Sequence, residues 1–345
     1  MNFLFLEDDD LQLIWDSIND TQLVFHPIYA STGSIDYSEI RTLNEEKEVS
    51  LILDRNLFSS LLSLAKNGDL KDTTEKRMIA FLMLWAQLNQ VPISAGLAIM
   101  ENASGYNDSY NAKIELNNFD DIFDFYPPQI WLNLARGTID QIPKCDFFNI
   151  PYENSITYHD TNDHFLMNYA SMLHLVNIYR DSDMDPVEKL LEFLSWNFDN
   201  LLISQYINTY LVMLFSNQNG IKAPKHANSD ILERIEKGCM NQAWDLTYLS
   251  CWSTLYWNES KTHEVFLFAT ADNLLKKIFI NTHNGRDLFN LIRIAFPKRN
   301  ADKIIQFYVE KTRNRTKPDF GDNPTQYFKS LIEKEKKHLK QSVGL

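Results

Sequence analysis

The chain has 345 residues, 44% of them hydrophobic, which is enough for one large domain or two smaller ones. Its three cysteines are widely spaced and form neither a disulfide framework nor a zinc site, and its N-terminus lacks the basic segment of a signal peptide. The longest apolar stretch, residues 201–215, is too short and too polar to span a bilayer, so we expect a cytoplasmic protein without membrane contact.

The net charge of −13 is unevenly distributed along the chain. Residues 276–345 carry a net charge of +9, whereas the remainder carries −22. A basic C-terminal segment on an otherwise acidic chain is typical of proteins whose basic segment contacts nucleic acid. A solvated C-terminal helix of mixed charge explains the same composition equally well, and both interpretations stay open.

Residues 1–48 form an N-terminal extension in which the pattern predicts a strand, a helix and a second strand, at residues 2–6, 11–19 and 22–29. The acidic run of residues 7–10 is explained as favourable charge at a helix N-terminus. Residues 49–53 follow as a short continuous apolar run. Such a run is typical of a strand that is buried on both faces in a parallel sheet, and this one ends at Asp54.

Helical spacing of apolar residues takes over after Asp54. Three helices are predicted near residues 57–64, 74–89 and 94–102, the last of which carries Glu101. Residues 106–237 read as a helical insertion, with helices expected near residues 119–125, 128–136, 165–179, 186–198 and 201–215.

The α/β pattern returns near residue 238. We expect a helix with Asp245 at its head, then a second buried strand at residues 265–270, with Asp272 just beyond it. Sites in open α/β sheets lie outside the carboxyl ends of the strands, and both buried strands deliver an aspartate at that end. Residues 286–345 form a basic helical C-terminal extension, in which the densest basic segment includes Arg313, Arg315 and Lys317.

Four acidic residues therefore stand at or near the ends of predicted elements, namely Asp54, Glu101, Asp245 and Asp272. Carboxylates forced together repel one another, whereas Mg²⁺ or Mn²⁺ prefers such oxygen ligands. The set therefore predicts a divalent metal site that acts on a phosphoryl group.

The segments LILDRN, PISAGLAIMEN, WDLTYLSCWSTLY and FLFATADNLLKKIF together resemble the PIN-domain nucleases. In that family a strand ends in an aspartate followed two residues later by asparagine, as in Asp54 and Asn56. A helix supplies a second acid, matched by Glu101, and another helix supplies a third, matched by Asp245. A last strand runs into Thr-x-Asp, matched by Thr270 and Asp272.

The resemblance implies an α/β fold with a mainly parallel sheet, in which residues 49–105 and 238–285 form the nuclease domain. It also implies metal-dependent hydrolysis of phosphodiesters, with RNA favoured over DNA, by Asp54, Glu101, Asp245 and Asp272. Arg313, Arg315 and Lys317 are the expected nucleic-acid contacts. The family's compact members lack the long gap between Glu101 and Asp245, and the helical insertion fills that gap here.

Other interpretations remain open at the level of the sequence. Each aspartate has an ordinary structural explanation, as a turn residue, as compensation of a helix dipole or as an N-cap. Glu75 and Glu115 compete with Glu101, and residues 159–164 hold two histidines and two aspartates that could bind a metal. The rival functions are a non-catalytic PIN-like protein whose helical insertion docks a protein partner and a phosphatase-like hydrolase of small substrates.

Overall fold

The computed structural model describes residue 6 and residues 8–106, 109–147, 162–217, 220–285 and 287–344. The chain divides into two compact units. The first unit comprises Met1–Asp160 and Trp252–Lys276, and the second comprises Thr161–Cys251 and Lys277–Leu345. Two helices, α11 (Leu232–Asn258) and α12 (Asn273–His283), contain residues of both units.

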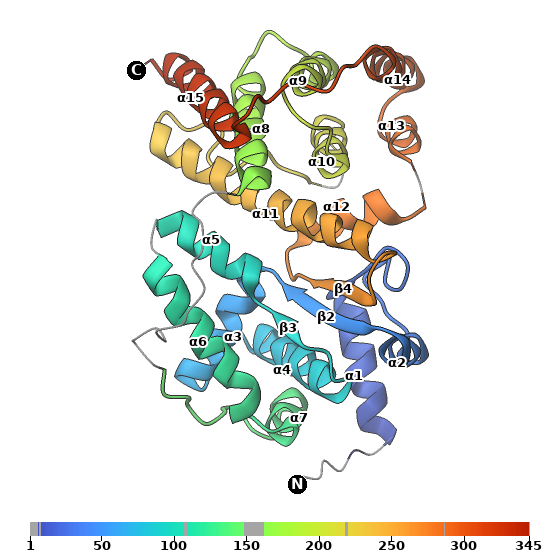
Figure 1. The fold of residues 1–345 in the computed structure, drawn as a ribbon, viewed down its shortest axis with the longest axis vertical. Helices are drawn as coiled ribbons and strands as arrows, with labels where there is room; N and C mark the ends of the chain where they lie inside the picture. The colour runs from blue at the N-terminus through green and yellow to red at the C-terminus, as the bar shows by residue number, and fades with distance from the viewer. Residues whose placement is uncertain are drawn as a thin grey trace. The chain divides into compact units, whose positions relative to one another are not determined.

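A four-stranded sheet forms the centre of the first unit (Figure 1). Its strands are β1 (Val24–Phe25), β2 (Glu48–Leu53), β3 (Ile93–Ser94) and β4 (Glu264–Ala269), in the order β1-β4-β2-β3. Strand β2 pairs in parallel with both β3 and β4, whereas β1 is antiparallel to β4. In the register of β2 and β4, Leu53 stands opposite Ala269, so the two strands end side by side.

Besides its parts of α11 and α12, the first unit contains these helices in its described residues: α1 (Asp8–Thr21), α2 (Tyr37–Glu46), α3 (Arg55–Asn67), α4 (Thr73–Leu88), α5 (Gly96–Tyr106), α6 (Ser109–Phe125) and α7 (Pro128–Arg136). Helix α4 is buried along most of its length and packs against α1 and α7. Helix α5 packs against β2, α3 and α6. Helix α3 ends at Gly68, which has a φ of 75° and closes the helix with a bond from its N–H to Leu64.

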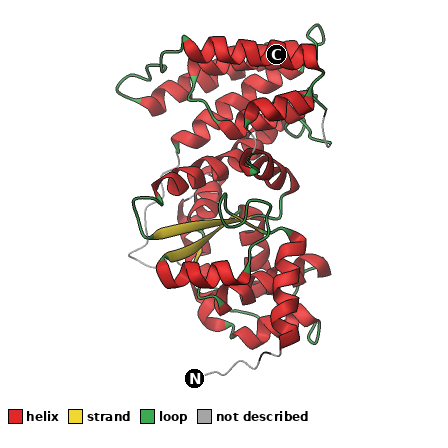
Figure 2. Ribbon diagram, turned by 90° about the vertical axis from the view of Figure 1, so that its right-hand side faces the viewer, coloured by secondary structure: helices red, strands yellow, loops and turns green. Residues whose placement is uncertain are grey.

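In the described part of the second unit, helices joined by loops are the only regular secondary structure (Figure 2). Besides its shares of α11 and α12, it contains α8 (Asp163–Tyr179), α9 (Pro186–Asn200), α10 (Gln205–Phe215), α13 (Leu288–Ala295), α14 (Lys298–Arg313) and α15 (Pro324–Ser342). Helices α8 and α15 pack closely, and the buried Glu335 of α15 accepts a hydrogen bond at 2.9 Å from His174 of α8. None of the described helices is both long enough and apolar enough to cross a membrane.

The predicted α/β class, with a mainly parallel sheet flanked by helices, is confirmed. Both buried strands lie where they were predicted, and the helix Pro128–Arg136 has the predicted bounds. The predicted strand at residues 2–6 lies almost wholly outside the described residues. The predicted strand at residues 22–29 shrinks to Val24–Phe25, because the chain turns back at once through a bridge between His26 and Ala30.

The domain boundaries also differ from the predicted ones. Residues 106–237 were predicted as one insertion, yet α6 and α7 belong to the first unit with the sheet. The remaining helices of that segment belong to the second unit, together with the predicted C-terminal extension.

The prediction that Asp245 begins a helix is wrong. Helix α11 begins at Leu232 and runs through Gly238 to Asn258, so Asp245 lies in its interior. Glycine usually weakens a helix, but here a Cβ atom at Gly238 would lie 1.8 Å from the carbonyl oxygen of Lys225. Gly238 therefore permits close approach of the backbone rather than ending the helix.

Substituting Gly238 with alanine is expected to destabilise the second unit by about 1–3 kcal/mol, because backbone must shift to relieve the overlap. This loss should appear although alanine is the better helix former by about 1 kcal/mol. Urea unfolding followed by circular dichroism measures it. The matched control, Asn241→Ala on the exposed face of α11, should change stability by less than about 0.5 kcal/mol. Equal stability of both variants would contradict the close approach.

Candidate active site

Asp54 stands at the carboxyl end of β2 and begins helix α3 as its N-cap. Its side chain is 1% exposed. Its Oδ1 accepts a hydrogen bond from the backbone N–H of Leu57 at 2.8 Å, and its Oδ2 accepts one from the hydroxyl of Thr270. The sequence produces this arrangement locally, because an aspartate directly after a buried strand caps the helix that leaves the sheet.

Thr270 and Asp272 follow the end of β4 in the same manner. The backbone N–H of Asp272 donates to Thr270 Oγ1 at 3.0 Å. Asp272 Oδ1 accepts the N–H groups of Leu274 and Leu275, at 2.7 and 2.9 Å, in the first turn of α12. Thr270 is fully buried and joins the two aspartates through its hydroxyl. The two strand ends and two helix N-termini therefore meet in one hydrogen-bonded group.

Burial raises the pKa of Asp54 from its ordinary value of 3.8 to about 6. The hydroxyl of Thr270 and the amide of Leu57 oppose this rise, whereas the negative charge of Asp272 adds to it. The carboxylate form of Asp54 is thus destabilised by its surroundings in spite of its hydrogen bonds. A proton or a cation bound beside it would relieve that penalty.

Lys276 lies one helical turn beyond Asp272 on α12, and sequence reasoning did not select it. Its Nζ donates to the backbone oxygen of Thr21 at 2.6 Å. Burial lowers the pKa of the Lys276 ammonium, and the negative charges of Asp54 and Asp272 act in the opposite direction. The spacing of four residues after Asp272 on a predicted helix was the available signal, since it places both side chains on one face.

The other predicted site residues do not belong to the hydrogen-bonded group of Asp54, Thr270 and Asp272. Glu101 lies within α5 and is partly buried, and Asn56 is exposed in the first turn of α3. Asp245 belongs to the second unit, where Gln242 Nε2 donates to its Oδ2 at 3.3 Å. Across the described residues, no three acidic, histidine or cysteine side chains are gathered closely enough to hold a metal ion. The structure thus joins Asp54 with Asp272 and does not assemble the predicted set of four.

Glu115, the alternative to Glu101, has a structural partner. Its carboxylate accepts two hydrogen bonds from the guanidinium of Arg55, at 2.6 and 3.0 Å, and a third from Asn102 at 2.7 Å. These contacts tie α6 to α3 and α5 beside Asp54. Sixty residues separate Arg55 from Glu115, so local sequence carried no signal for the pair.

The predicted basic segment lies at the end of α14 and in the loop after it. Arg315 Nε donates to the carbonyl of Phe198 at 3.1 Å, and another of its nitrogens donates to the carbonyl of Leu201. Arg315 therefore satisfies carbonyl groups at the C-terminus of α9, which is a structural role. Arg313 and Lys317 are exposed.

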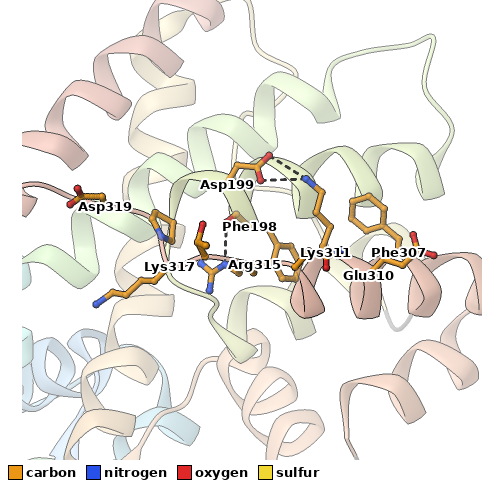
Figure 3. A pocket seen from close by; sticks show the side chains of 11 residues that line it. Phe198, Asp199, Phe307, Glu310, Lys311, Arg315, Lys317 and Asp319 are labelled. Carbon is orange, nitrogen blue, oxygen red and sulfur yellow. Dashed lines mark hydrogen bonds and ion pairs between the residues drawn. The ribbon is translucent and has the colours of Figure 1, made fainter.

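A pocket of about 640 Å³ lies between the end of α9 and this basic segment (Figure 3). Its lining contains Lys311, which pairs with both carboxylate oxygens of Asp199 at 3.3 Å, as well as Lys317 and Asp319. Its lining contains equal numbers of acidic and basic side chains, so no single sign of charge dominates the pocket.

The histidine-containing stretch at residues 159–164 lies partly outside the described residues, which begin again at Asn162. Asp163 accepts a hydrogen bond from the hydroxyl of Thr325 at 2.8 Å, and His164 stands in the first turn of α8. Burial lowers the pKa of His164. The backbone N–H of His164 donates to the N-cap Asn162 at 2.8 Å, so both residues belong to the first turn of α8.

Asp54 and Asp272 are the two carboxylates that a hard cation at this edge of the sheet would have as ligands. Mg²⁺ is commonly held in proteins by one or two carboxylates together with water and substrate phosphate. The hydrogen bonds described for Asp272 use its Oδ1, which leaves its Oδ2 as a ligand. The raised pKa of Asp54 and the charge of Asp272 also favour a cation beside them.

No protein-family model, curated protein or solved structure matched this chain in comparisons with known proteins. The case for any function therefore rests on the residues and geometry of the site.

Proposed function

We propose that the protein is a divalent-metal-dependent nuclease that hydrolyses phosphodiester bonds, with RNA favoured over DNA. The observation that supports it is the pairing of Asp54 with Thr270 and Asp272 at the adjacent carboxyl ends of β2 and β4. The proposal keeps the order of acidic and hydroxyl residues that resembles the PIN-domain nucleases.

The sheet topology favours a ligand at this place. The chain passes from β2 outward to β3 and later returns to place β4 on the other side of β2 (Figure 1). In open α/β sheets, ligands bind in the crevice outside the carboxyl ends of the strands where the strand order reverses. The N-termini of α3 and α12 lie at the same edge, where their first-turn amides stabilise the negative charges of Asp54 and Asp272.

In the proposed reaction, Asp54 and Asp272 would hold the cation, and Thr270 fixes the orientation of Asp54. The hydroxyl of Thr270 donates a hydrogen bond to Asp54 and accepts one from the backbone N–H of Asp272. These two bonds fix the orientation of the hydroxyl. The chemistry that Mg²⁺ or Mn²⁺ would supply here is stabilisation of charge on the phosphoryl oxygens and activation of water. Hydrolysis consumes one water, whose oxygen forms the new bond to phosphorus as the ester bond breaks, and the leaving oxygen takes up a proton.

The test uses the purified full-length protein with labelled single-stranded RNA, labelled single-stranded DNA and a phosphomonoester, each with Mn²⁺ and with chelator. Cleavage of RNA that depends on Mn²⁺ is expected. Release of phosphate from the monoester alone would replace the nuclease by a phosphatase. No reaction with any substrate would favour a non-catalytic protein that docks a partner through its helices.

Arg313 and Lys317 are the exposed basic residues proposed to contact the nucleic-acid backbone. We expect replacement of both with glutamine to reduce the salt dependence of RNA binding. The slope of the logarithm of the binding constant against the logarithm of the salt concentration should become less steep by about 1.4, because each phosphate contact with a single strand contributes about 0.7 to it. Fluorescence anisotropy with labelled RNA across a salt series in chelator measures the slope. The double variant Lys66→Gln and Lys71→Gln, at exposed lysines of the first unit, is the control. Equal slopes for both double variants would exclude contact by Arg313 and Lys317.

A further inference from the structure

The ammonium of Lys276 lies near the carboxyl end of β4, because it donates to the carbonyl of Thr21, and the carbonyl of Leu23, two residues further on, accepts the N–H of Thr270 at 3.1 Å. Lys276 follows Asp272 by one turn, and its backbone N–H donates to the carbonyl of Asp272 at 3.0 Å. Its ammonium is anchored to the carbonyl of Thr21, the last residue of α1, at 2.6 Å. An ammonium has three N–H donors, and the contacts described for Lys276 Nζ engage one of them.

The charges around Lys276 are those of the candidate site itself. Its electrostatic partners are the carboxylates of Asp54 and Asp272, and the side chain is partly buried. Partial burial strengthens these interactions relative to those of a lysine in water. The three groups together carry a net charge of −1 when all are ionised, so one divalent cation changes the local charge to +1.

We infer that Lys276 binds the substrate phosphate and provides the second positive charge of the site, so that the chain uses one divalent cation rather than two. This inference rests on the proposed nuclease function. A site for two cations commonly needs more carboxylates, and the described residues bring two together. A phosphodiester adds one negative charge, which the ammonium and the cation together neutralise. Lysine is a compact point charge that binds phosphate oxygens, and the anchor at Thr21 holds it in place.

The binding experiment titrates Mn²⁺ into the full-length protein by calorimetry without substrate. One Mn²⁺ per chain is expected. In chelator, where no cleavage occurs, Lys276→Met should weaken the binding of labelled single-stranded RNA by about fivefold to tenfold, as expected for one charge-assisted contact. Lys66→Met serves as the matched control, because this exposed lysine stands at the far end of α3 from Asp54, about 18 Å along the helix.

The kinetic experiment follows RNA cleavage against Mn²⁺ concentration. Wild type should show a Hill coefficient near one. Lys276→Met should lose about a hundredfold in kcat, as for removal of one preorganised donor, and should recover part of it at high Mn²⁺ with a steeper dependence. Lys276→Arg should retain most activity. Lys276→Gln keeps an N–H donor without the charge, and melting curves show whether each variant is folded.

The outcomes separate the inference from the function on which it rests. Two Mn²⁺ per wild-type chain, or unchanged kinetics and RNA binding in folded Lys276→Met and Lys276→Gln, would overturn the role of Lys276 and leave the nuclease intact. A wild-type protein that neither binds Mn²⁺ nor cleaves RNA would overturn both.

Discussion

Replacing Asp272 with asparagine is expected to abolish cleavage of single-stranded RNA, with a loss in kcat/KM of at least about a thousandfold, or about 4 kcal/mol. Asparagine keeps the size of the side chain and an oxygen that can accept the amides of Leu274 and Leu275. The first turn of α12 should therefore persist. What disappears is the negative charge that attracts the cation, and that charge is what the proposed chemistry requires.

Melting curves run beside the cleavage assay separate loss of the cation from loss of the fold. Wild type should gain stability from added Mn²⁺, because a ligand that binds the folded state alone stabilises it by mass action. Asp272→Asn should lose most of that gain and melt at least as high as wild type in chelator, since repulsion with Asp54 is relieved. Asp146→Asn, at an exposed position of the first unit, should behave as wild type. Cleavage that survives in Asp272→Asn would place the active site elsewhere.

Replacing Asp54 with asparagine is expected to change how the stability of the protein depends on pH. Burial raises the pKa of Asp54 from 3.8 to about 6 in the folded chain. The folded state therefore binds this proton more tightly than the unfolded state. Its contribution to stability is fully present below pH 3.8 and is lost as pH rises to about 6. The displaced pKa corresponds to about 3 kcal/mol.

The measurement is the free energy of unfolding by urea at pH 4 and at pH 7, in chelator, for wild type and for Asp54→Asn. Wild type should lose more stability between pH 4 and pH 7 than the variant does, by about 2 kcal/mol, because part of the contribution of Asp54 is already lost at pH 4. Any constant cost of the substitution cancels in this comparison. The exposed Asp146→Asn should leave the wild-type dependence unchanged. If the free energy of unfolding depends on pH in the same way in Asp54→Asn and wild type, burial does not raise the pKa of the Asp54 carboxyl.

Local sequence was sufficient for the elements that hold the candidate site. Continuous apolar runs identified β2 and β4, because a strand covered on both faces requires apolar residues at every position. The aspartates after these strands could be selected as site residues for the same reason, since a charged residue cannot continue a buried strand. The parallel arrangement of the strands then implied that Asp54 and Asp272 lie at one edge, and the electrostatic coupling between them agrees.

Tertiary structure decided the roles that depend on distant partners. Gly238 lies within α11 because the backbone at Lys225 approaches it, and a propensity scale that treats glycine as a helix breaker cannot include that contact. Arg315 serves the carbonyl groups of Phe198 and Leu201, although its neighbours in sequence suggested a nucleic-acid contact.

The sequence by itself therefore determined the buried strands, the aspartates at their ends and most of the helices, because these follow from the period and polarity of adjacent residues. Only the tertiary structure decided which of the four acids meet and that the positive charge of Lys276 interacts with them. The ammonium of Lys276 is held by a hydrogen bond to the carbonyl of Thr21, 255 residues away in the chain. Contacts across such separations depend on how the elements pack, and no local pattern of side chains encodes that packing.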